Sequence, residues 1–323
     1  MDSNSILITG ACGMVGSHLI DHYFDLHGIK PIATFYKPTT DIQEIQHKAI
    51  WTECDVRYGD KLRNLIFEYK PSKIFHLAAQ SYPTVSWERP LETNDINVNG
   101  TIHVFEGVKW MRKFDPNYDP VVVVACSSAE YGASLTPENV PISEDTILLP
   151  LHPYGVSKVS QDLLSYQYFV NDKIKCIRAR IFNTTGPRKI NDVASDFAKR
   201  AVQIERGEEK VMRVGNLETK RAITDVRDLI QALLLLSDRG IMGEVYNISG
   251  QNVYQIKEII PILESKINQK IIIEQDPKLF RPTDEPIIFG DSSRLKRDTG
   301  WTQKYSLDQT LGDMIQYFRG VRN

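Results

Sequence analysis

Short apolar runs alternate with segments of helical periodicity through the first half of the chain. The runs, each expected to form a strand, occupy residues 5–10, 30–36, 49–56, 72–79, 120–128 and 174–183. Apolar residues three or four positions apart predict helices at 13–27, 60–70, 90–113 and 153–170. Four consecutive valines, Val121–Val124, suit a parallel strand that is covered on both faces. This alternation predicts an α/β fold with a doubly wound parallel sheet and right-handed connections.

Beyond residue 183 the alternation becomes irregular. We expect helices at 195–207, 229–240, 254–267 and 307–319, with a kink near Pro261, and short strands within 209–228, 244–250 and 270–276. The sequence therefore predicts a sheet domain over residues 1–182 and a smaller mixed α/β lobe over residues 183–323. Some strand or helix exchange from the lobe back to the first domain is also expected.

Three glycines follow the first predicted strand and open the first helix, in the stretch TGACGMVGSHL. Gly10, Gly13 and Gly16 have a spacing that, between a strand and a helix, indicates a dinucleotide-binding (Rossmann) turn. Gly10 permits the tight turn, Gly13 lets the backbone approach a pyrophosphate, and Gly16 lets the helix pack on the strand. Met14 and Val15 lie at the helix N-terminus, whose partial positive charge favours phosphate. A glycine-rich turn without a ligand is the alternative.

The second strand ends without the carboxylate that commonly binds the NAD ribose. Its end reads Thr34 to Lys37, and the first acid after it is Asp41. Lys37 is a candidate for a 2′-phosphate contact, which favours NADP(H) over NAD(H), although a solvated lysine is the alternative. Asp55 and Val56 follow the third strand and are candidates for the adenine side, or Asp55 simply forms a turn.

A tyrosine and a lysine stand four residues apart at the start of a predicted helix. Tyr154 and Lys158 therefore share one helix face. The ammonium is expected to favour the phenolate and lower the tyrosine pKa, which would make Tyr154 a general acid or base near neutral pH. The valine-rich strand ends in Ser127 and Ser128 at the sheet edge where ligands bind in such folds. A serine hydroxyl beside Tyr154 could bond the substrate oxygen, and a loop-capping pair of serines is the alternative.

The composition indicates which kinds of binding partner to expect. The hydrophobic fraction of 41% and the charged fraction of 25% are typical of a globular enzyme. A formal net charge of −2 gives no reason to expect a nucleic acid or an anionic membrane as partner. No secretory leader and no apolar run of about 18 residues is apparent, so we expect a cytoplasmic protein. Four distant cysteines and seven scattered histidines predict reduced thiols and no metal site.

Several motifs together resemble the extended short-chain dehydrogenases/reductases that act on nucleotide sugars. They are TGACGMVGSHL, HLAAQS, NVNGT, SSAEYG, YGVSK and RIFNTTGPR. Three longer stretches, HLAAQSYPTVSWERPLET, SDFAKRAVQIERGE and RPTDEPIIFGDSSRLKRDTGW, resemble the branch of GDP-mannose 4,6-dehydratase and GDP-4-keto-6-deoxymannose reductase. This resemblance implies that residues 1–182 bind the dinucleotide and that residues 183–323 bind the nucleotide sugar. It also implies a homodimer or a dimer of dimers, paired through helices near 90–113 and 153–170.

The resemblance carries over to individual positions. It implies that Ser127, Tyr154 and Lys158 form the catalytic triad, with Tyr154 and Lys158 also contacting the cofactor. The further cofactor contacts that it implies are Leu77, Ala78, Ala79 and Asn97. The positions that it assigns to the nucleotide diphosphate of the substrate are Asn183, Arg188, Arg221 and Arg281.

One departure from the resemblance affects the expected reaction. Family 4,6-dehydratases have a glutamate two residues after the triad serine or threonine, where this chain has Ala129. Glu130 is next, but on an extended segment a shift of one residue turns the side chain to the opposite face. We therefore expect NAD(P)-dependent hydride transfer at C4 of a GDP-sugar, as a 4-keto reductase, C4 dehydrogenase or epimerase. A 4,6-dehydratase with Glu130 as acid is one alternative, and a non-catalytic dinucleotide sensor is another.

Overall fold

The sheet of the first domain is wholly parallel. The structure, a computed structural model, describes residues 5–280 and 285–321. Within these residues seven strands pair in the order β11-β6-β5-β4-β1-β2-β3. Their bounds are β1 Ile6–Thr9, β2 Ile32–Phe35, β3 Ile50–Glu53, β4 Lys73–His76, β5 Val121–Ser127, β6 Cys176–Ile181 and β11 Val245–Ile248. The predicted doubly wound fold is confirmed.

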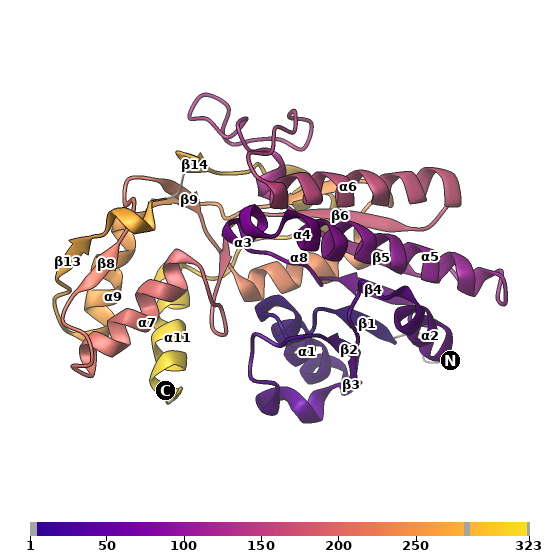
Figure 1. The fold of residues 1–323 in the computed structure, drawn as a ribbon, viewed down its shortest axis with the longest axis horizontal. Coiled ribbons are helices and arrows are strands. Elements are labelled where there is room, and N and C mark those ends of the chain that lie inside the picture. Colours follow the sequence, from indigo (N-terminus) through magenta and orange to yellow (C-terminus); the bar gives the residue numbers. More distant parts are fainter. Residues whose placement is uncertain (1–4, 281–284, 322–323) are drawn as a thin grey trace.

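Helices cover both faces of this sheet (Figure 1). One core cluster joins α1 (Met14–His27) and α8 (Val226–Arg239) to Ile6 and Ile8 of β1. A second cluster joins α2 (Gly59–Tyr69), α5 (Gly100–Arg112) and α6 (Pro153–Asp172) to Leu7 of the same strand. Successive side chains of a strand point to opposite faces, so an unbroken apolar run serves both cores.

The helix predicted at 90–113 is interrupted. It follows α3 (Pro83–Glu88) and consists of α4 (Pro90–Asn94), a π-helical turn at Asp95–Asn99, and α5. Single π-helical turns inside α-helices are frequent at functional sites.

The second lobe has a core of its own and lies at the left of Figure 1. Its helices are α7 (Val193–Glu205), α9 (Ile259–Ile267) and α11 (Leu307–Gly320). Its small sheets pair β8 (Met212–Val214) with β13 (Ile273–Gln275), β9 (Lys220–Ala222) with β12 (Val253–Gln255) and β14 (Ile287–Ile288), and β7 (Thr184–Thr185) with β10 (Thr224–Asp225). The kink expected at Pro261 is replaced by a helix start. A 3₁₀ turn ends at Glu258 and α9 begins at Ile259, so Pro261 lies in the first turn, where proline removes no helical hydrogen bond.

The expected boundary at residue 182 is crossed by two elements of the C-terminal half. β11 pairs with β6 from Val245↔Arg178 to Ile248↔Ile181 and forms one edge of the large sheet. α8 packs against α1. The division into residues 1–182 and 183–323 stays a prediction, with β11 and α8 as the elements exchanged back.

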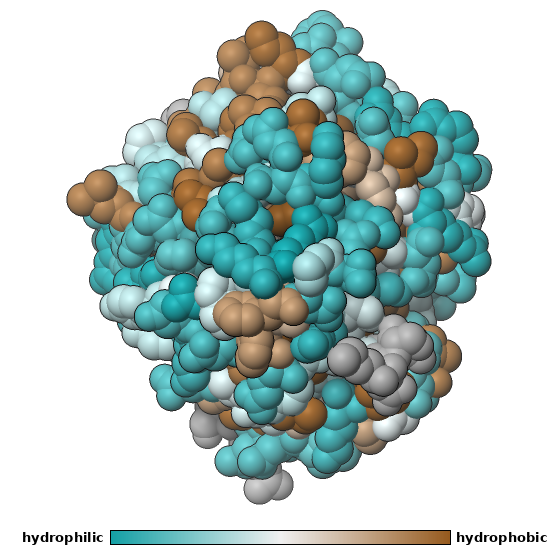
Figure 2. Space-filling view, turned by 90° about the vertical axis from the view of Figure 1, so that its right-hand side faces the viewer, coloured by the Kyte–Doolittle hydropathy of each residue, from teal (hydrophilic) through white to brown (hydrophobic). Residues whose placement is uncertain are grey.

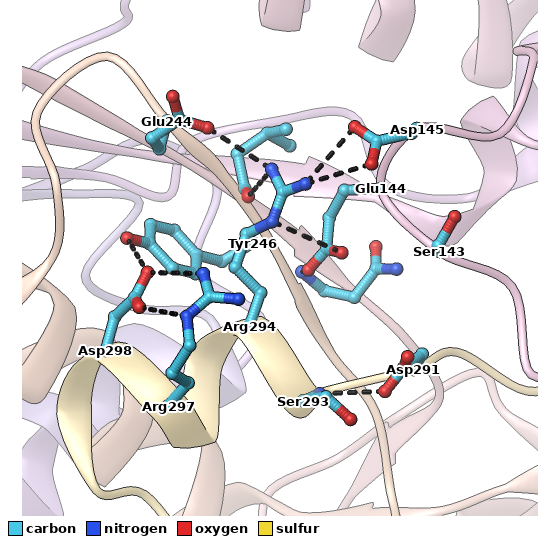
Figure 3. A network of polar contacts seen from close by, with 12 residues as sticks. Ser143, Glu144, Asp145, Glu244, Tyr246, Asp291, Ser293, Arg294, Arg297 and Asp298 are labelled. Atoms are coloured by element: carbon cyan, nitrogen blue, oxygen red, sulfur yellow. Dashed lines mark hydrogen bonds and ion pairs between the residues drawn. The ribbon is translucent and has the colours of Figure 1, made fainter.

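The long connection between β5 and α6 is tied to β11 and to α10 (Ser293–Thr299), as Figure 3 shows. Arg294 of α10 reaches Asp145 and Glu244, each at 3.2 Å, and lies 3.7 Å from Glu144. Glu144 in turn accepts a hydrogen bond of 2.9 Å from the backbone N–H of Asn247. The connection that separates Ser127 from Tyr154 in sequence is therefore fixed at its centre.

The face at the right of Figure 1 is shown in Figure 2 and is mainly hydrophilic, with separate hydrophobic areas. In the part of the chain that the structure describes, no helix combines the length and the apolar character needed to cross a bilayer.

Candidate active site

Ser127 is the last residue of β5 and caps the 3₁₀ turn Ser128–Glu130. Its Oγ accepts a hydrogen bond of 3.1 Å from the backbone N–H of Ala129. The Ser127 side chain is also near the Tyr154 phenol, whose pKa it lowers. The predicted meeting of a serine from β5 with the tyrosine of α6 is therefore present in the structure.

α6 presents Tyr154 and Lys158 to the end of β5. The helix starts at Pro153, and His152 caps it by accepting a hydrogen bond of 3.0 Å from the N–H of Gly155. Lys158 is 3% exposed, and its Nζ donates to the carbonyl oxygen of Ala125 at 2.7 Å. The same Nζ lies 5.8 Å from the centroid of the Tyr154 ring. Serine, tyrosine and lysine thus converge, as the sequence predicts.

The expected lowering of the tyrosine pKa is not found. Burial raises the pKa of Tyr154 to about 12, and the nearby Ser127 side chain offsets only part of this effect. The ammonium of Lys158 donates to the Ala125 carbonyl rather than to the phenol oxygen, which weakens the attraction that the prediction assumed. Burial also lowers the pKa of Lys158 to about 8, because few compensating charges surround its ammonium.

Glu130 lies in a buried ionic cluster. Its carboxylate is fully buried, accepts a hydrogen bond of 2.8 Å from the N–H of Ser127, and lies 3.1 Å from Nε of Arg180. Asp162 of α6 binds the same Arg180 at 2.9 Å and also Arg178 at 2.6 Å. Glu130, Asp162 and Cys126 are close enough to share a metal ion, but the guanidinium of Arg180 already lies against both carboxylates. We interpret this group as an ion-pair cluster that supports the turn after β5.

The glycine turn fits a bound dinucleotide. Gly10 has a φ of +68°, and a Cβ there would lie 2.7 Å from Cα of Ala78. A Cβ on Gly16 would lie 2.6 Å from the carbonyl oxygen of Gly10, so the helix packs directly on the turn. A Cβ on Gly13 would meet only one atom, at 3.4 Å, which leaves the N-terminus of α1 open to a phosphate. Met14 and Val15 follow in the first turn of α1.

The segment after β4 lies against this turn. Leu77, Ala78 and Ala79 are all half-buried, and the N–H of Ala78 donates to Thr9 Oγ1 at 3.2 Å. Asn97, expected as a cofactor contact, has a different set of partners in the structure. It is fully buried in the π-helical turn, accepts from the N–H of Gln80 at 2.8 Å, and donates to the Gln80 carbonyl at 3.1 Å and to Ser157 Oγ at 2.8 Å. Asn97 therefore holds the segment after β4 against α6.

Lys37 and Asp55 both lie where the neighbouring strands β2 and β3 end. Lys37 is exposed, and its Nζ lies 5.3 Å from the centroid of the Tyr36 ring. Asp55 is bound by Arg57 at 2.6 Å. Burial raises the pKa of Asp55, but the Arg57 hydrogen bonds outweigh this effect and lower it overall. Val56 is buried beside them, and its carbonyl oxygen lies 2.8 Å from Nδ1 of His103.

A cavity of about 610 Å³ lies in the second lobe. Asn183 and Arg221, two of the predicted substrate residues, both line it. Ile181 pairs with Ser127, so Asn183 follows the end of β6 close to the serine. Four further cations line the cavity: Lys189, Lys199, Arg200 and Arg213.

Two predicted substrate residues are not brought to this cavity. Arg188 forms ion pairs with Asp21 at 2.6 Å and Glu44 at 3.1 Å, so its charge is already balanced between the lobes. We do not retain Arg188 as a substrate contact. Arg281 lies outside the described residues.

Comparison with known proteins identifies the family. The family model for GDP-mannose 4,6 dehydratase matches residues 7–314. The chain belongs to the GDP-mannose 4,6 dehydratase family. This result confirms the resemblance to the extended short-chain dehydrogenases/reductases.

Two relatives and one solved structure show what the chain is similar to. A GDP-6-deoxy-D-mannose reductase of Pseudomonas aeruginosa is 28% identical over 308 residues, covering 95% of this chain and 94% of that protein. A GDP-mannose 4,6-dehydratase of Vibrio cholerae is 25% identical over 356 residues, covering 96% and 92%. The solved structure of RMD from Pseudomonas aeruginosa, complexed with NADPH, superposes with a TM-score of 0.83 at 25% identity, covering 98% of this chain and all (100%) of that one.

Three residues of the site were not predicted from the sequence: Gln161, Arg57 and Arg180. Gln161 stands seven positions after Tyr154 on the same face of α6, and this spacing could have indicated it. Arg57 stands two residues after Asp55, which is close enough to suggest a pair. Arg180 gave no such signal, because its partners Glu130 and Asp162 come from other elements.

Proposed function

We propose that this protein transfers a hydride between a nicotinamide dinucleotide and C4 of a nucleotide sugar, with a GDP-sugar as the substrate class. The observation that carries the proposal is that Ser127 at the end of β5 meets Tyr154 of α6, with the Nζ of the buried Lys158 lying 5.8 Å from the centroid of the tyrosine ring. Acid–base groups so placed, at the carboxyl edge of a parallel sheet and next to a glycine turn, suit carbonyl and carbinol chemistry.

The bound cofactor supplies or accepts the hydride. In the reductive direction, Tyr154 donates its hydroxyl proton to the sugar O4 as that oxygen gains charge, and Ser127 hydrogen-bonds the same oxygen. Lys158 favours the phenolate that remains and offers a donor to the cofactor ribose. In the oxidative direction, used by a dehydrogenase or in the first half of an epimerisation, Tyr154 takes the proton from the C4 hydroxyl. A reductase fits Ala129, because carbonyl reduction needs no elimination acid at that position.

We assign the nucleotide part of the substrate to the cavity of the second lobe. Arg221 lies in its wall, and its Nη1 donates to the carbonyl oxygens of Lys220 and Glu285, each at 2.9 Å. These bonds fix one edge of a guanidinium, and such a group binds phosphate in a bidentate manner. The lysines and arginines that share the wall would add to the attraction of a diphosphate.

For the cofactor we propose NADP(H) in preference to NAD(H). Lys37 and Arg57 lie at the ends of neighbouring strands, where the adenosine ribose of a dinucleotide would lie. Lys37 is an exposed cation, and the one carboxylate named here, Asp55, is already bound by Arg57, so this position suits a 2′-phosphate better than a free 2′-hydroxyl. The NADPH bound to RMD of Pseudomonas aeruginosa supports this choice.

A 4,6-dehydratase is the second candidate, because the Vibrio cholerae dehydratase resembles the chain over nearly its whole length. That reaction needs an acid near C6 of the sugar. Ala129 cannot supply one, and the contacts of Glu130 with Ser127 and Arg180 turn its carboxylate toward the interior. If Glu130→Gln abolished formation of a dehydrated product, this second candidate would replace the first.

We also propose a homodimer or a dimer of dimers that pairs through α5 and α6. The outer face of α6 exposes Val156, Leu163, Tyr166 and Val170, which is a large apolar surface for one helix. Light scattering of the wild type and of Leu163→Arg tests this proposal, and the expected result is a dimer that the substitution converts to monomer.

One assay separates the proposed function from its alternatives. Purified protein is mixed with reduced nicotinamide cofactor and a GDP-4-keto-6-deoxyhexose, and the absorbance of the cofactor is followed. A reductase consumes the cofactor with a stoichiometry of one per sugar. The oxidised cofactor with GDP-mannose, followed by mass spectrometry, detects a dehydratase by loss of water. Cofactor binding without turnover of any GDP-sugar would favour the dinucleotide sensor.

A further inference from the structure

A third polar residue of α6 contacts the catalytic lysine. Gln161 is fully buried, and its Oε1 accepts a hydrogen bond of 2.8 Å from Nζ of Lys158. It lies three residues after Lys158 and seven after Tyr154, so all three side chains share one face of the helix. The direction of this bond is fixed, because an ammonium can only donate and must face the oxygen of the amide.

The ammonium of Lys158 is held by neutral groups alone. Two of its three N–H donors go to the carbonyl oxygen of Ala125 and to Gln161 Oε1, at 2.7 and 2.8 Å. Within residues 5–280 and 285–321, no carboxylate lies within ion-pair distance of Nζ. The third donor is therefore the one that remains for Tyr154 or for a cofactor ribose.

The amide nitrogen of Gln161 has no hydrogen-bond partner among the described residues. Leaving a buried N–H₂ group unpaired costs about 1–3 kcal/mol, so the amide is not there to stabilise the fold. A methionine of similar shape would remove this cost. What the glutamine provides in return is an uncharged acceptor at the lysine.

We propose that Gln161 is a positioning residue, which fixes the ammonium of Lys158 through its amide oxygen and leaves one N–H directed at the cofactor ribose and the tyrosine. This inference rests on the proposed function, because it assumes that a nicotinamide cofactor meets Lys158. A neutral acceptor holds the ammonium without cancelling its charge, so that charge remains available to the cofactor ribose and to the phenolate that forms during turnover. A carboxylate at the same position would hold the lysine more firmly but would neutralise its effect on the phenol.

The titratable groups that face Lys158 come from three elements. They are Cys126 of β5 with Glu130 of the following turn, His76 of β4, and Tyr154 of α6 itself. Burial raises the pKa of Cys126 well above its ordinary value and lowers the pKa of His76 to about 3, so neither carries charge near neutral pH. Burial also raises the pKa of Glu130 to about 8, so Glu130 and Lys158 titrate in the same range, and the part of a pH midpoint that the Gln161 variants move is the part assigned to the lysine.

The test measures equilibrium binding of NADPH, by quenching of protein fluorescence, from pH 6 to 10. The proteins are the wild type, Gln161→Met, Gln161→Glu and the control Ser165→Ala. Ser165 is buried one turn further along α6 and donates to the carbonyl oxygen of Gln161, so its replacement disturbs the helix without touching Lys158. Wild-type affinity should fall above about pH 8, where Lys158 loses its proton.

Gln161→Met should move this midpoint down by about one pH unit and weaken binding at pH 8 several-fold, with its thermal midpoint unchanged or raised. Gln161→Glu should move the pH midpoint up by about one unit, because it adds an anion beside the ammonium. The same variant should slow turnover while KM for the cofactor changes little. Ser165→Ala should keep the wild-type midpoint.

Identical pH midpoints in the wild type and both glutamine variants would overturn the inference, as would equal shifts in the control. If Gln161→Met does not fold, the upward shift of the pH midpoint in Gln161→Glu tests the inference by itself. A wild type that binds no nicotinamide cofactor would instead refute the proposed function, so the two failures are distinguishable.

Discussion

Two buried cations flank the carboxyl end of β5, and their surroundings differ completely. Arg180, on β6, is bound by two carboxylates, those of Glu130 and Asp162, and also donates to the hydroxyl of Tyr131 at 2.9 Å. Lys158, on α6, donates its hydrogen bonds among the described residues to a carbonyl oxygen and an amide oxygen. Tyr131 in turn donates to Asn247 at 2.7 Å, which links the Arg180 cluster to β11.

The difference indicates that Arg180 stabilises the fold and that Lys158 takes part in the proposed reaction. A buried guanidinium between carboxylates keeps its proton under all ordinary conditions, so it serves as a fixed structural charge. A buried ammonium among neutral oxygens has its pKa moved toward neutrality, and groups tuned in this way gather at catalytic sites. Substitutions around Arg180 should therefore change mainly the stability of the protein, and substitutions around Lys158 should change mainly its activity.

The largest effect is expected on the Lys158 side. Tyr154→Phe removes the hydroxyl that exchanges the proton, so turnover of a confirmed substrate should fall by roughly 10²–10⁴-fold, the usual contribution of general acid–base catalysis. Thermal stability and NADPH affinity should stay close to those of the wild type. Steady-state kinetics with a binding titration checks this prediction, and turnover within a few-fold of normal would contradict the assignment of Tyr154.

On the Arg180 side the effect should appear in stability. Arg180→Met leaves Glu130 and Asp162 buried without their cation, which should lower the free energy of unfolding by about 3–5 kcal/mol. Urea denaturation at neutral pH measures this change. In the control Arg89→Met, the lost ion pair with Glu92 involves an arginine side chain that is 65% exposed, and a change below about 1 kcal/mol is expected. Equal losses in both variants would show that the buried cluster has no special role.

Lys158 should also make the free energy of unfolding depend on pH. Burial lowers the pKa of Lys158 from 10.5 to about 8. Between these pH values the unfolded chain binds a proton that the folded protein does not, so the unfolding free energy rises with pH across this window. Relative to Lys158→Met, the wild type should gain up to about 3 kcal/mol from pH 8 to 10.5. Parallel stability curves for the two proteins would contradict the buried, neutral-partnered ammonium.

The smallest effect is expected at the edge of the sheet, where the cations are accessible. Lys37→Ala and Arg57→Ala should each weaken NADPH binding about tenfold, because a charge-assisted phosphate contact contributes roughly 1.5 kcal/mol, and should leave NADH binding nearly unchanged. Calorimetry with both cofactors makes this comparison. A parallel loss of NADPH and NADH affinity would assign these residues to the general fold of the site and would remove the argument for NADP(H).

The sequence predicted local features well and long-range partnerships poorly. The glycine spacing, the apolar strands and the tyrosine–lysine pair are local, and the structure places them as expected. The sign of the Tyr154 pKa shift was predicted wrongly, because burial raises the pKa of the phenol and the spacing of residues along a helix does not show how deeply a side chain is buried. Arg188 was expected at the substrate, but its partners Asp21 and Glu44 lie far away in the sequence.

The sequence by itself determined which elements form and which side chains reach the sheet edge, because strand and helix periodicity and glycine conformations are properties of short segments. Only the tertiary structure decided how the charges are partnered: which cation receives carboxylates, which receives neutral oxygens, and where a cavity opens in the second lobe. Those outcomes depend on burial and on distances between elements that are remote in the chain. Burial determines the protonation of Lys158, and burial between carboxylates keeps Arg180 permanently charged.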